Sequence, residues 1–288
     1  PLAVATKLFF HRMKFAKRLS RVMEKSLPEW GPFWLNYKLL KKKIKMMTPT
    51  GQAAASPRPT TRETLASSQK EVEFFRLMDA EMRKGAQFFA CVEEQFTLRT
   101  RNVREGLKAT EHLLQSPSLG LADFVTEETR TEMWTYLIRA CITVYTELLL
   151  LEHWAVTSYC GFTKILKKHD RWTGYMTKEK YMRSALAKQQ FLNYPKLLRM
   201  VAEVEALSKE ITRRIPDPEQ RRAFESHALG AKQVAAAAMS EYTAYAQQLL
   251  ADPRSSGDEA AVEASSGPTA AAGASRASPT RQLSCSPL

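Results

Sequence analysis

A run of basic residues in the second half of the chain has the spacing of one helical face. Residues 164–171 are Lys-Ile-Leu-Lys-Lys-His-Asp-Arg, and the cations fall at positions i, i+3, i+4 and i+7. These positions share one side of an α-helix. Like charges so placed repel by roughly 0.2–0.5 kcal/mol per pair, so this arrangement does not stabilise a helix but suits an anionic ligand. A basic face that is merely solvated remains the alternative. The cations are Lys164, Lys167, Lys168 and Arg171.

A second basic run near the N-terminus repeats this spacing. Its members are Lys38, Lys41, Lys42 and Lys45. Tyr37 precedes Lys41 by about one turn, so a hydroxyl and an ammonium can face the same ligand. Two simpler interpretations stay open. Tyr37 could be a core tyrosine with its hydroxyl at the surface, and Lys42, Lys43 and Lys45 could be solvated charges.

The composition points to an anionic partner. The chain has 43 basic and 30 acidic residues, a net charge of +13. Such an excess is typical of proteins that bind nucleic acid, a membrane surface or a polyphosphorylated small molecule. The four cysteines have neither metal-ligand spacing nor the pattern of a disulfide framework, which favours a reducing, intracellular setting. No transmembrane segment is expected, because charges interrupt the most apolar stretch, residues 144–162.

The motifs of common enzymes are missing from the sequence. It contains no glycine-rich phosphate loop, dinucleotide fingerprint, zinc-protease motif or nucleophile elbow. The five histidines are scattered, and His153, within an apolar stretch, is more typical of a core residue than of a ligand. We therefore expect a binding protein rather than an enzyme, with neither a cofactor nor a metal.

The spacing of apolar residues predicts an all-helical fold. The first two predicted helices form a hairpin, and the two longest ones pack side by side. Neither a strand-like alternation of useful length nor an internal repeat is present. The predicted helices cover residues 14–26, 29–47, 62–115, 126–169, 177–187, 194–214 and 217–250.

The remaining segments have compositions that set them apart. Residues 1–12 precede the first methionine, Met13, and we expect them to be an N-terminal extension. Residues 48–61 are rich in Pro, Ala, Thr and Ser, which predicts a flexible linker. Residues 215–250 are expected to add a C-terminal helix. Residues 251–288 carry almost no bulky apolar side chains, which predicts a disordered tail.

Three stretches, taken together and in this order, resemble the SPX domain. The resemblance extends over residues 13–214, with residues 48–61 as a linker inside it, and the chain looks like a stand-alone SPX domain-containing protein. The stretches are Met13-Lys14-Phe15-Ala16-Lys17-Arg18-Leu19; then Leu27-Pro28-Glu29-Trp30, Leu35-Asn36-Tyr37-Lys38, Leu40-Lys41-Lys42 and Ile44-Lys45; then Gly161-Phe162, Lys164 to Arg171, and Thr173-Gly174.

The resemblance implies a fold and a ligand. The fold is an N-terminal helical hairpin packed on a bundle of two long helices with smaller C-terminal helices. The ligand is inositol hexakisphosphate or an inositol pyrophosphate, bound as a reporter of cellular phosphate. Arg171 stands where the family usually has lysine, which changes a point charge into a planar fork. Carried over from the family, the binding residues are Tyr37, Lys41 and Lys167, a neighbouring cluster of Lys164, Lys168 and Arg171, and Lys14 as a further contact.

The resemblance also implies a sensor that regulates a protein partner and lies in the cytoplasm, the nucleus or both. In plants, stand-alone members inhibit MYB-type transcription factors of the phosphate-starvation response. Two alternatives stay open. One is a regulatory subunit or fragment of an SPX-bearing transporter or polyphosphate polymerase. The other is a basic helical protein that binds nucleic acid directly, which is less favoured because no exposed aromatic residues interleave the basic runs.

Overall fold

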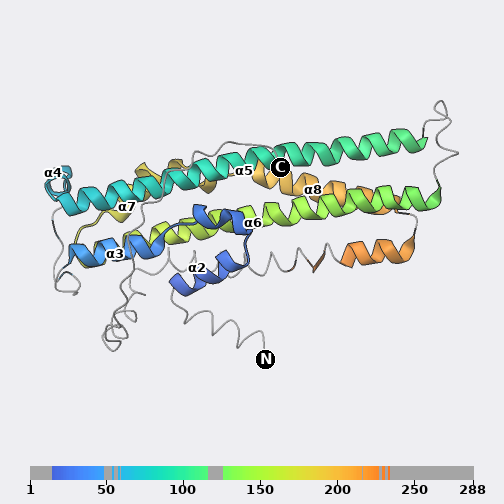
Figure 1. The fold of residues 1–288 in the computed structure, drawn as a ribbon. Coiled ribbons are helices and arrows are strands. Elements are labelled where there is room, and N and C mark those ends of the chain that lie inside the picture. Colours follow the sequence, from blue (N-terminus) through green and yellow to red (C-terminus); the bar gives the residue numbers. More distant parts are fainter. Residues whose placement is uncertain are drawn as a thin grey trace.

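The computed structural model describes residues 15–48, 60–115, 126–215 and 217–226, together with residues 54, 58, 229, 230 and 233. Within these ranges the chain forms α-helices and short 3-10 helices, and no strand is assigned. Figure 1 shows two long helices side by side, with shorter helices along their flanks. The all-helical prediction is therefore confirmed.

The two long helices are α5 (Gln69–Gln115) and α6 (Glu127–Thr173), each of 47 residues. At 1.5 Å per residue each is about 70 Å long. They run antiparallel (Figure 1). The predicted helix over 62–115 is interrupted after α4 (Arg62–Ala66), because the chain turns at Ser67 before α5 begins. The prediction that the second helix ends at residue 169 was also wrong. That helix continues to Gly174, whose φ of 80° ends it in the left-handed conformation that glycine tolerates.

The hairpin consists of α2 (Phe15–Glu24), the 3-10 helix η1 (Pro28–Phe33) and α3 (Tyr37–Met47). The predicted helix over 29–47 was too long. Pro32 lacks the backbone N–H that a continuing helix needs, so the chain passes through a 3-10 turn and starts again at α3. Asn36 caps this restart, its side-chain oxygen accepting a hydrogen bond from the backbone N–H of Leu39 at 3.1 Å. Tyr37 is consequently the first residue of α3.

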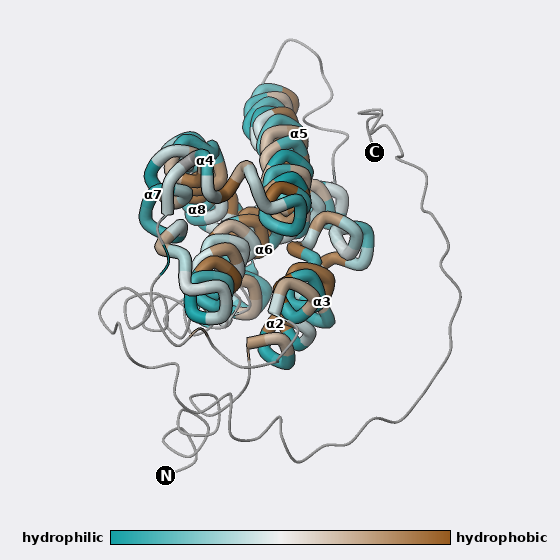
Figure 2. The backbone as a smooth tube through the Cα atoms, turned by 90° about the vertical axis from the view of Figure 1, so that its left-hand side faces the viewer, coloured by the Kyte–Doolittle hydropathy of each residue, from teal (hydrophilic) through white to brown (hydrophobic). Residues whose placement is uncertain are grey.

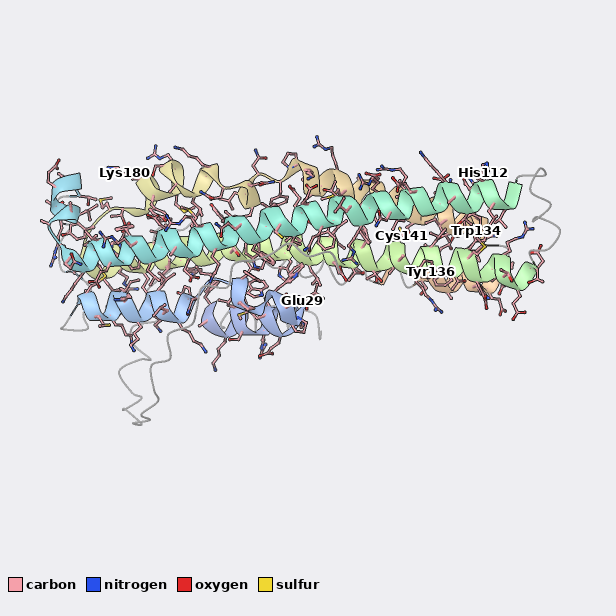
Figure 3. The ribbon with its side chains drawn as sticks, turned by 45° about the horizontal axis from the view of Figure 1, so that its top comes forward. Glu29, His112, Trp134, Tyr136, Cys141 and Lys180 are labelled. Atoms are coloured by element: carbon pink, nitrogen blue, oxygen red, sulfur yellow. The ribbon has the colours of Figure 1, made fainter. Side chains whose placement is uncertain are left out.

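The hairpin packs on one half of the bundle through its apolar side. Leu40 and Ile44 of α3 are fully buried, and Phe15 and Leu19 of α2 are nearly so. Figure 2 looks along the bundle and places α6 in the middle, between α5, α8 and the hairpin. The predicted arrangement of a hairpin on a bundle is therefore confirmed. In Figure 3 the hairpin, marked by Glu29, leaves uncovered the half of the bundle that carries Trp134.

The C-terminal helices cover the other side of the two long ones. They are α7 (Lys178–Ser184), the 3-10 turns η3 (Leu186–Lys188) and η4 (Gln190–Leu192), and α8 (Pro195–Arg214). A further helical segment covers residues 218–226. Most of the helix expected up to residue 250, the extension at 1–12 and the tail at 251–288 lie outside the described residues.

α6 is long and apolar enough to cross a membrane by length and composition alone. Its most apolar window has a mean hydropathy of 1.3, and half of that window is buried inside the bundle. A helix that contacts α3, α5, α7 and α8 must be apolar around most of its circumference. The bundle core therefore accounts for this composition.

Candidate anion-binding site

The start of α3 is held against α5 by polar contacts. The backbone N–H of Asn36 donates to the Glu81 carboxylate at 2.8 Å, and Lys84 donates both to the carbonyl oxygen of Trp34 (3.0 Å) and to Glu81 (2.7 Å). Tyr37 follows directly. Its side chain is only 6% exposed. The position of Tyr37, the first candidate binding residue, is therefore fixed by the contacts between the start of α3 and α5.

Tyr37 lies where α2 and α3 meet. Its ring contacts that of Phe15, with centroids 4.8 Å apart. A Cβ on Gly161 of α6 would approach Phe15 to 3.4 Å and the Leu35 side chain to 2.5 Å. The absence of a side chain at Gly161 thus lets the hairpin rest directly on the backbone of α6, beside the basic run of residues 164–171.

The two basic runs lie at similar heights along the bundle. α3 and α6 are in contact and run in the same direction (Figure 1). The same number of residues separates Lys41 from Leu35 as separates Lys167 from Gly161. Since Leu35 meets Gly161, Lys41 and Lys167 lie level to within about one helical turn, roughly 5 Å. The fold therefore brings together the elements that carry Tyr37, Lys41 and Lys167.

The cations of α6 lie in the last turns of the helix. Lys164, Lys167, Lys168 and Arg171 are all partly buried. The ammonium of Lys168 stands over the ring of Trp172, 4.9 Å from its centroid. Because the C-terminal end of a helix carries partial negative charge, part of this positive charge is compensated locally.

α2 contributes a cation that was not predicted as a site residue. Arg18 is only 8% exposed. Burial raises the pKa of the Cys160 thiol to about 12, and the charges of Arg18 and Lys164 oppose that rise, so both cations stand near this residue. The sequence signal for Arg18 was its place in the first of the three SPX-like stretches. The predicted contact Lys14 lies outside the described residues.

A buried polar cluster fixes the end of α6 from behind. His169, fully buried, places Nε2 at 2.8 Å from the Glu71 carboxylate of α5 and Nδ1 at 3.0 Å from the Asp170 carboxylate. The Thr177 hydroxyl donates to Asp170 at 2.6 Å. His169 belongs to the third SPX-like stretch but was not predicted as a site residue. Its position inside the basic run was the available signal.

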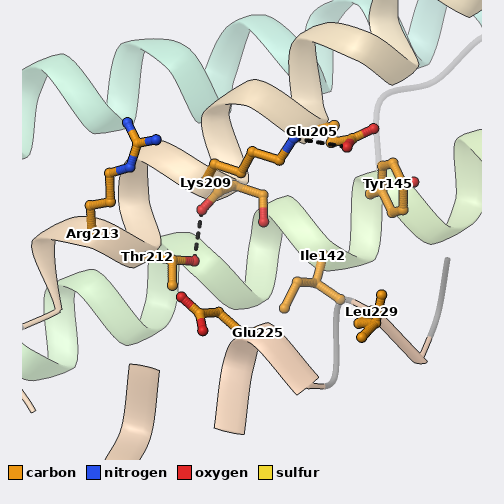
Figure 4. A pocket seen from close by; sticks show the side chains of 9 residues that line it. Ile142, Tyr145, Glu205, Lys209, Thr212, Arg213, Glu225 and Leu229 are labelled. Atoms are coloured by element: carbon orange, nitrogen blue, oxygen red, sulfur yellow. Dashed lines mark hydrogen bonds and ion pairs between the residues drawn. The ribbon is translucent and has the colours of Figure 1, made fainter. Parts of the chain in front are cut away.

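A hollow of about 440 Å³ lies on the half of the bundle away from the hairpin, between α6, α8 and the segment after α8 (Figure 4). Its apolar wall includes Ile142 and Leu229. It is lined by two cations, Lys209 and Arg213, and two carboxylates, Glu205 and Glu225, and Lys209 is paired with Glu205 at 3.0 Å. Mixed charge of this kind suits a polyanion poorly. The part of the chain that the structure describes holds no cluster of three or more His, Cys, Asp or Glu side chains that could bind a metal.

Comparison with known proteins gives the family. No family model matches the chain. It is 32% identical over 206 residues to SPX domain-containing protein 5 of Oryza sativa subsp. indica, covering 72% of this chain and 70% of the relative. It is 29% identical over 204 residues to SPX domain-containing protein 1 of Arabidopsis thaliana, covering 69% and 71%. The chain therefore belongs to the family of SPX domain-containing proteins.

A solved structure of the same family is also similar. It is the SPX domain of Chaetomium thermophilum glycerophosphodiester phosphodiesterase 1 in complex with inositol hexakisphosphate. The TM-score is 0.43 at 21% identity, and the match covers 69% of this chain and 99% of the other.

Proposed function

We propose that this protein binds an inositol polyphosphate, in particular an inositol pyrophosphate, and thereby senses cellular phosphate status. One observation carries the proposal: Leu35 of the hairpin meets Gly161 of α6 and α3 contacts α6, so two helices that each carry a basic run are neighbours. Family membership supports it. The proposed contacts are Tyr37, Lys41 and Lys167, flanked by Lys164, Lys168 and Arg171, with Lys14 as a further cation.

The chemistry of these residues suits such a ligand. A compact polyphosphate needs many cations that converge from separate elements. Lysine supplies point charges that can adjust to closely spaced phosphates. The Tyr37 hydroxyl adds a neutral donor at the buried end of the site. Little apolar contact is required, so a surface between two helices is sufficient.

Ligand binding would also change the protein. Without a ligand, the cations of α3 and α6 repel across the contact between these helices. A bound polyanion removes that repulsion and fixes the pose of the hairpin on α6, so a partner that recognises this pose binds more tightly. We propose that the protein is such a regulator and not an enzyme. By the resemblance to stand-alone plant members, the proposed partner is a MYB-type transcription factor, met in the cytoplasm or the nucleus.

Calorimetric titration tests this function. Inositol hexakisphosphate and an inositol pyrophosphate should each saturate one site at about 0.15 M salt, where exposed charges are screened beyond about 8 Å. A competitor duplex or single-stranded nucleic acid should not displace them, because contacts to backbone phosphates alone weaken steeply with salt. If nucleic acid displaces the inositol ligand at equal phosphate concentration, or binds when the inositol phosphates do not, the basic faces serve nucleic acid and the proposal fails.

A further inference from the structure

The polar cluster behind the basic run of α6 has an arrangement that requires a definite charge state. Both ring nitrogens of His169 face carboxylate oxygens, Glu71 on one side and Asp170 on the other. A neutral imidazole carries one N–H and so can donate to only one of them. The other nitrogen would then turn its lone pair toward a carboxylate in a site shielded from water. The Thr177 hydroxyl lies 3.3 Å from Nδ1, but its proton is engaged by Asp170 at 2.6 Å. The doubly protonated ring satisfies both carboxylates.

The surroundings support this charge state from several elements. Burial by itself would lower the pKa of His169, but hydrogen bonds from the ring to Asp170 and Glu71, and the charges of both carboxylates, outweigh it and hold the pKa above its ordinary value. Phe74 stacks on the imidazole at 4.6 Å, and Phe75 meets it edge-on at 5.3 Å. The face of Phe74, stacked on the imidazole, stabilises a cation there.

The two carboxylates link His169 to the starts of other helices and help to hold these helices together. Asp170 accepts hydrogen bonds from the Thr177 hydroxyl at 2.6 Å and from the backbone N–H of Lys178 at 2.8 Å, at the start of α7. Glu71 lies in the first turn of α5 and is 3% exposed. One imidazolium thus connects the beginnings of α5 and α7 to the last turn of α6.

Other ionisable groups nearby do not take part in this bridge. Behind Phe75, Tyr181 of α7 donates to Asp79 of α5 at 2.7 Å. Burial, together with that carboxylate, raises the pKa of Tyr181 far above the neutral range, so it does not titrate with the histidine. Lys167 and Lys168 precede His169 directly, and Arg171 follows two positions later.

We propose that His169 is a positioning residue of the inositol phosphate site, whose protonated ring holds the cations of α6 in place and links ligand binding to a buried proton. This inference rests on the proposed function. Ligand and proton then favour the same state, so by reciprocity a bound ligand makes His169 harder to deprotonate. Stability from a group whose pKa is raised is present below its unfolded value, near 6.5, and is lost as pH rises through the folded value. The affinity for the ligand should fall as well, by up to about tenfold for each pH unit above the pKa of His169 in the folded protein.

The test uses the full chain with inositol hexakisphosphate as the probe. Its phosphates also titrate, so each variant is measured against wild type over one pH series. The ratio of wild-type to His169→Gln affinity should fall as pH rises. Glu71→Gln, which keeps the ring but removes one carboxylate, should lower the titration midpoint of His169. His112→Gln makes the same change at an exposed position on the half of α5 that the hairpin leaves uncovered, and it should follow wild type (Figure 3).

Nuclear magnetic resonance of the imidazole gives a readout that a purely structural role would not move. The His169 ring should be doubly protonated at neutral pH, and its titration midpoint should rise when the ligand is bound. A ring that is neutral at pH 7, a midpoint that the ligand leaves unchanged, or equal pH profiles for wild type and both cluster variants would overturn the inference while the proposed function stands. If wild type binds no inositol hexakisphosphate at any pH, both fail.

Discussion

A methyl group added to Gly161 would lie 2.5 Å from Cδ2 of Leu35. The hairpin therefore rests on the bare backbone of α6, and this contact sets the height of α3 against the basic run. Leu35 is 6% exposed and has little room to move aside. The relation between the two halves of the candidate site thus depends on one missing side chain.

Gly161→Ala should destabilise the fold by about 1–3 kcal/mol, the usual effect of overpacking a core, less up to about 1 kcal/mol from the better helix propensity of alanine. It should also weaken inositol hexakisphosphate binding, because the hairpin must shift. Denaturant unfolding and calorimetry measure the two effects. Gly31→Ala is the matched control, since a Cβ there meets nothing within 4 Å. Equal stability and affinity for Gly161→Ala and wild type would show that the contact does not set the site.

Single changes in the proposed contacts should reduce affinity without changing the fold. Lys41→Ala and Lys167→Ala each remove a charge-assisted contact of about 1.5–3 kcal/mol, or tenfold and more in affinity for an inositol pyrophosphate. Tyr37→Phe should weaken binding by less, because it removes one neutral donor. Circular dichroism should show unchanged helical content.

Lys42→Ala is the control for these variants. It removes the same charge from the position next to Lys41, and Lys42 is exposed. Its affinity should stay close to that of wild type. If Tyr37→Phe, Lys41→Ala and Lys167→Ala all bind as wild type does, the residues carried over from the family are the wrong ones.

A second histidine should act on stability in the opposite sense to His169. Burial, with a smaller contribution from the charge of Lys25, lowers the pKa of His153 to about 4. Between its unfolded value near 6.5 and this value, only the unfolded chain binds the proton, so stability falls as pH drops through that window. Because the side chain is partly exposed, we expect the total loss of folding free energy across this window to be about 1–3 kcal/mol. In urea unfolding, the His153→Gln variant should lose less stability than wild type as the pH falls from about 6.5 toward about 4. If both proteins show the same pH dependence of stability, the prediction is wrong.

The purified protein should not turn over ATP, polyphosphate or an inositol phosphate. The expectation comes from the missing catalytic motifs in the sequence. Phosphate release assays with each compound check it. Reproducible turnover that a single substitution in this chain abolishes would make the protein an enzyme.

The sequence predicted the helices well because apolar spacing is a local signal. The errors occurred where a local signal was overlooked or a long helix was assumed to be continuous. Pro32 was available in the sequence and shortens α3, which moves Tyr37 to a helix start. Ser67 separates α4 from α5, although serine alone does not require a break.

From the sequence, the candidate site could be predicted only as two separate basic helical faces, without their relative position. Spacing showed that Lys41 and Lys167 each lie in a basic run, but their common height depends on Gly161 meeting Leu35. The pairing of His169 with Glu71 joins residues 98 positions apart, which no local pattern encodes. The buried position of Arg18 likewise depends on how α2 packs.

The placement of the indole rings gives the protein its own optical reporter. Trp34 of the hairpin and Trp154 of α6 are buried with ring centroids 6.2 Å apart, so their fluorescence depends on hairpin docking. Trp172 lies under the Lys168 ammonium, within the candidate site, and its emission should respond to a bound polyanion. Trp134 lies in the half of the bundle that the hairpin leaves uncovered (Figure 3), so a variant that keeps Trp134 alone gives the reference for variants that keep Trp34 or Trp172 alone, and docking and ligand occupancy can be followed without an attached dye.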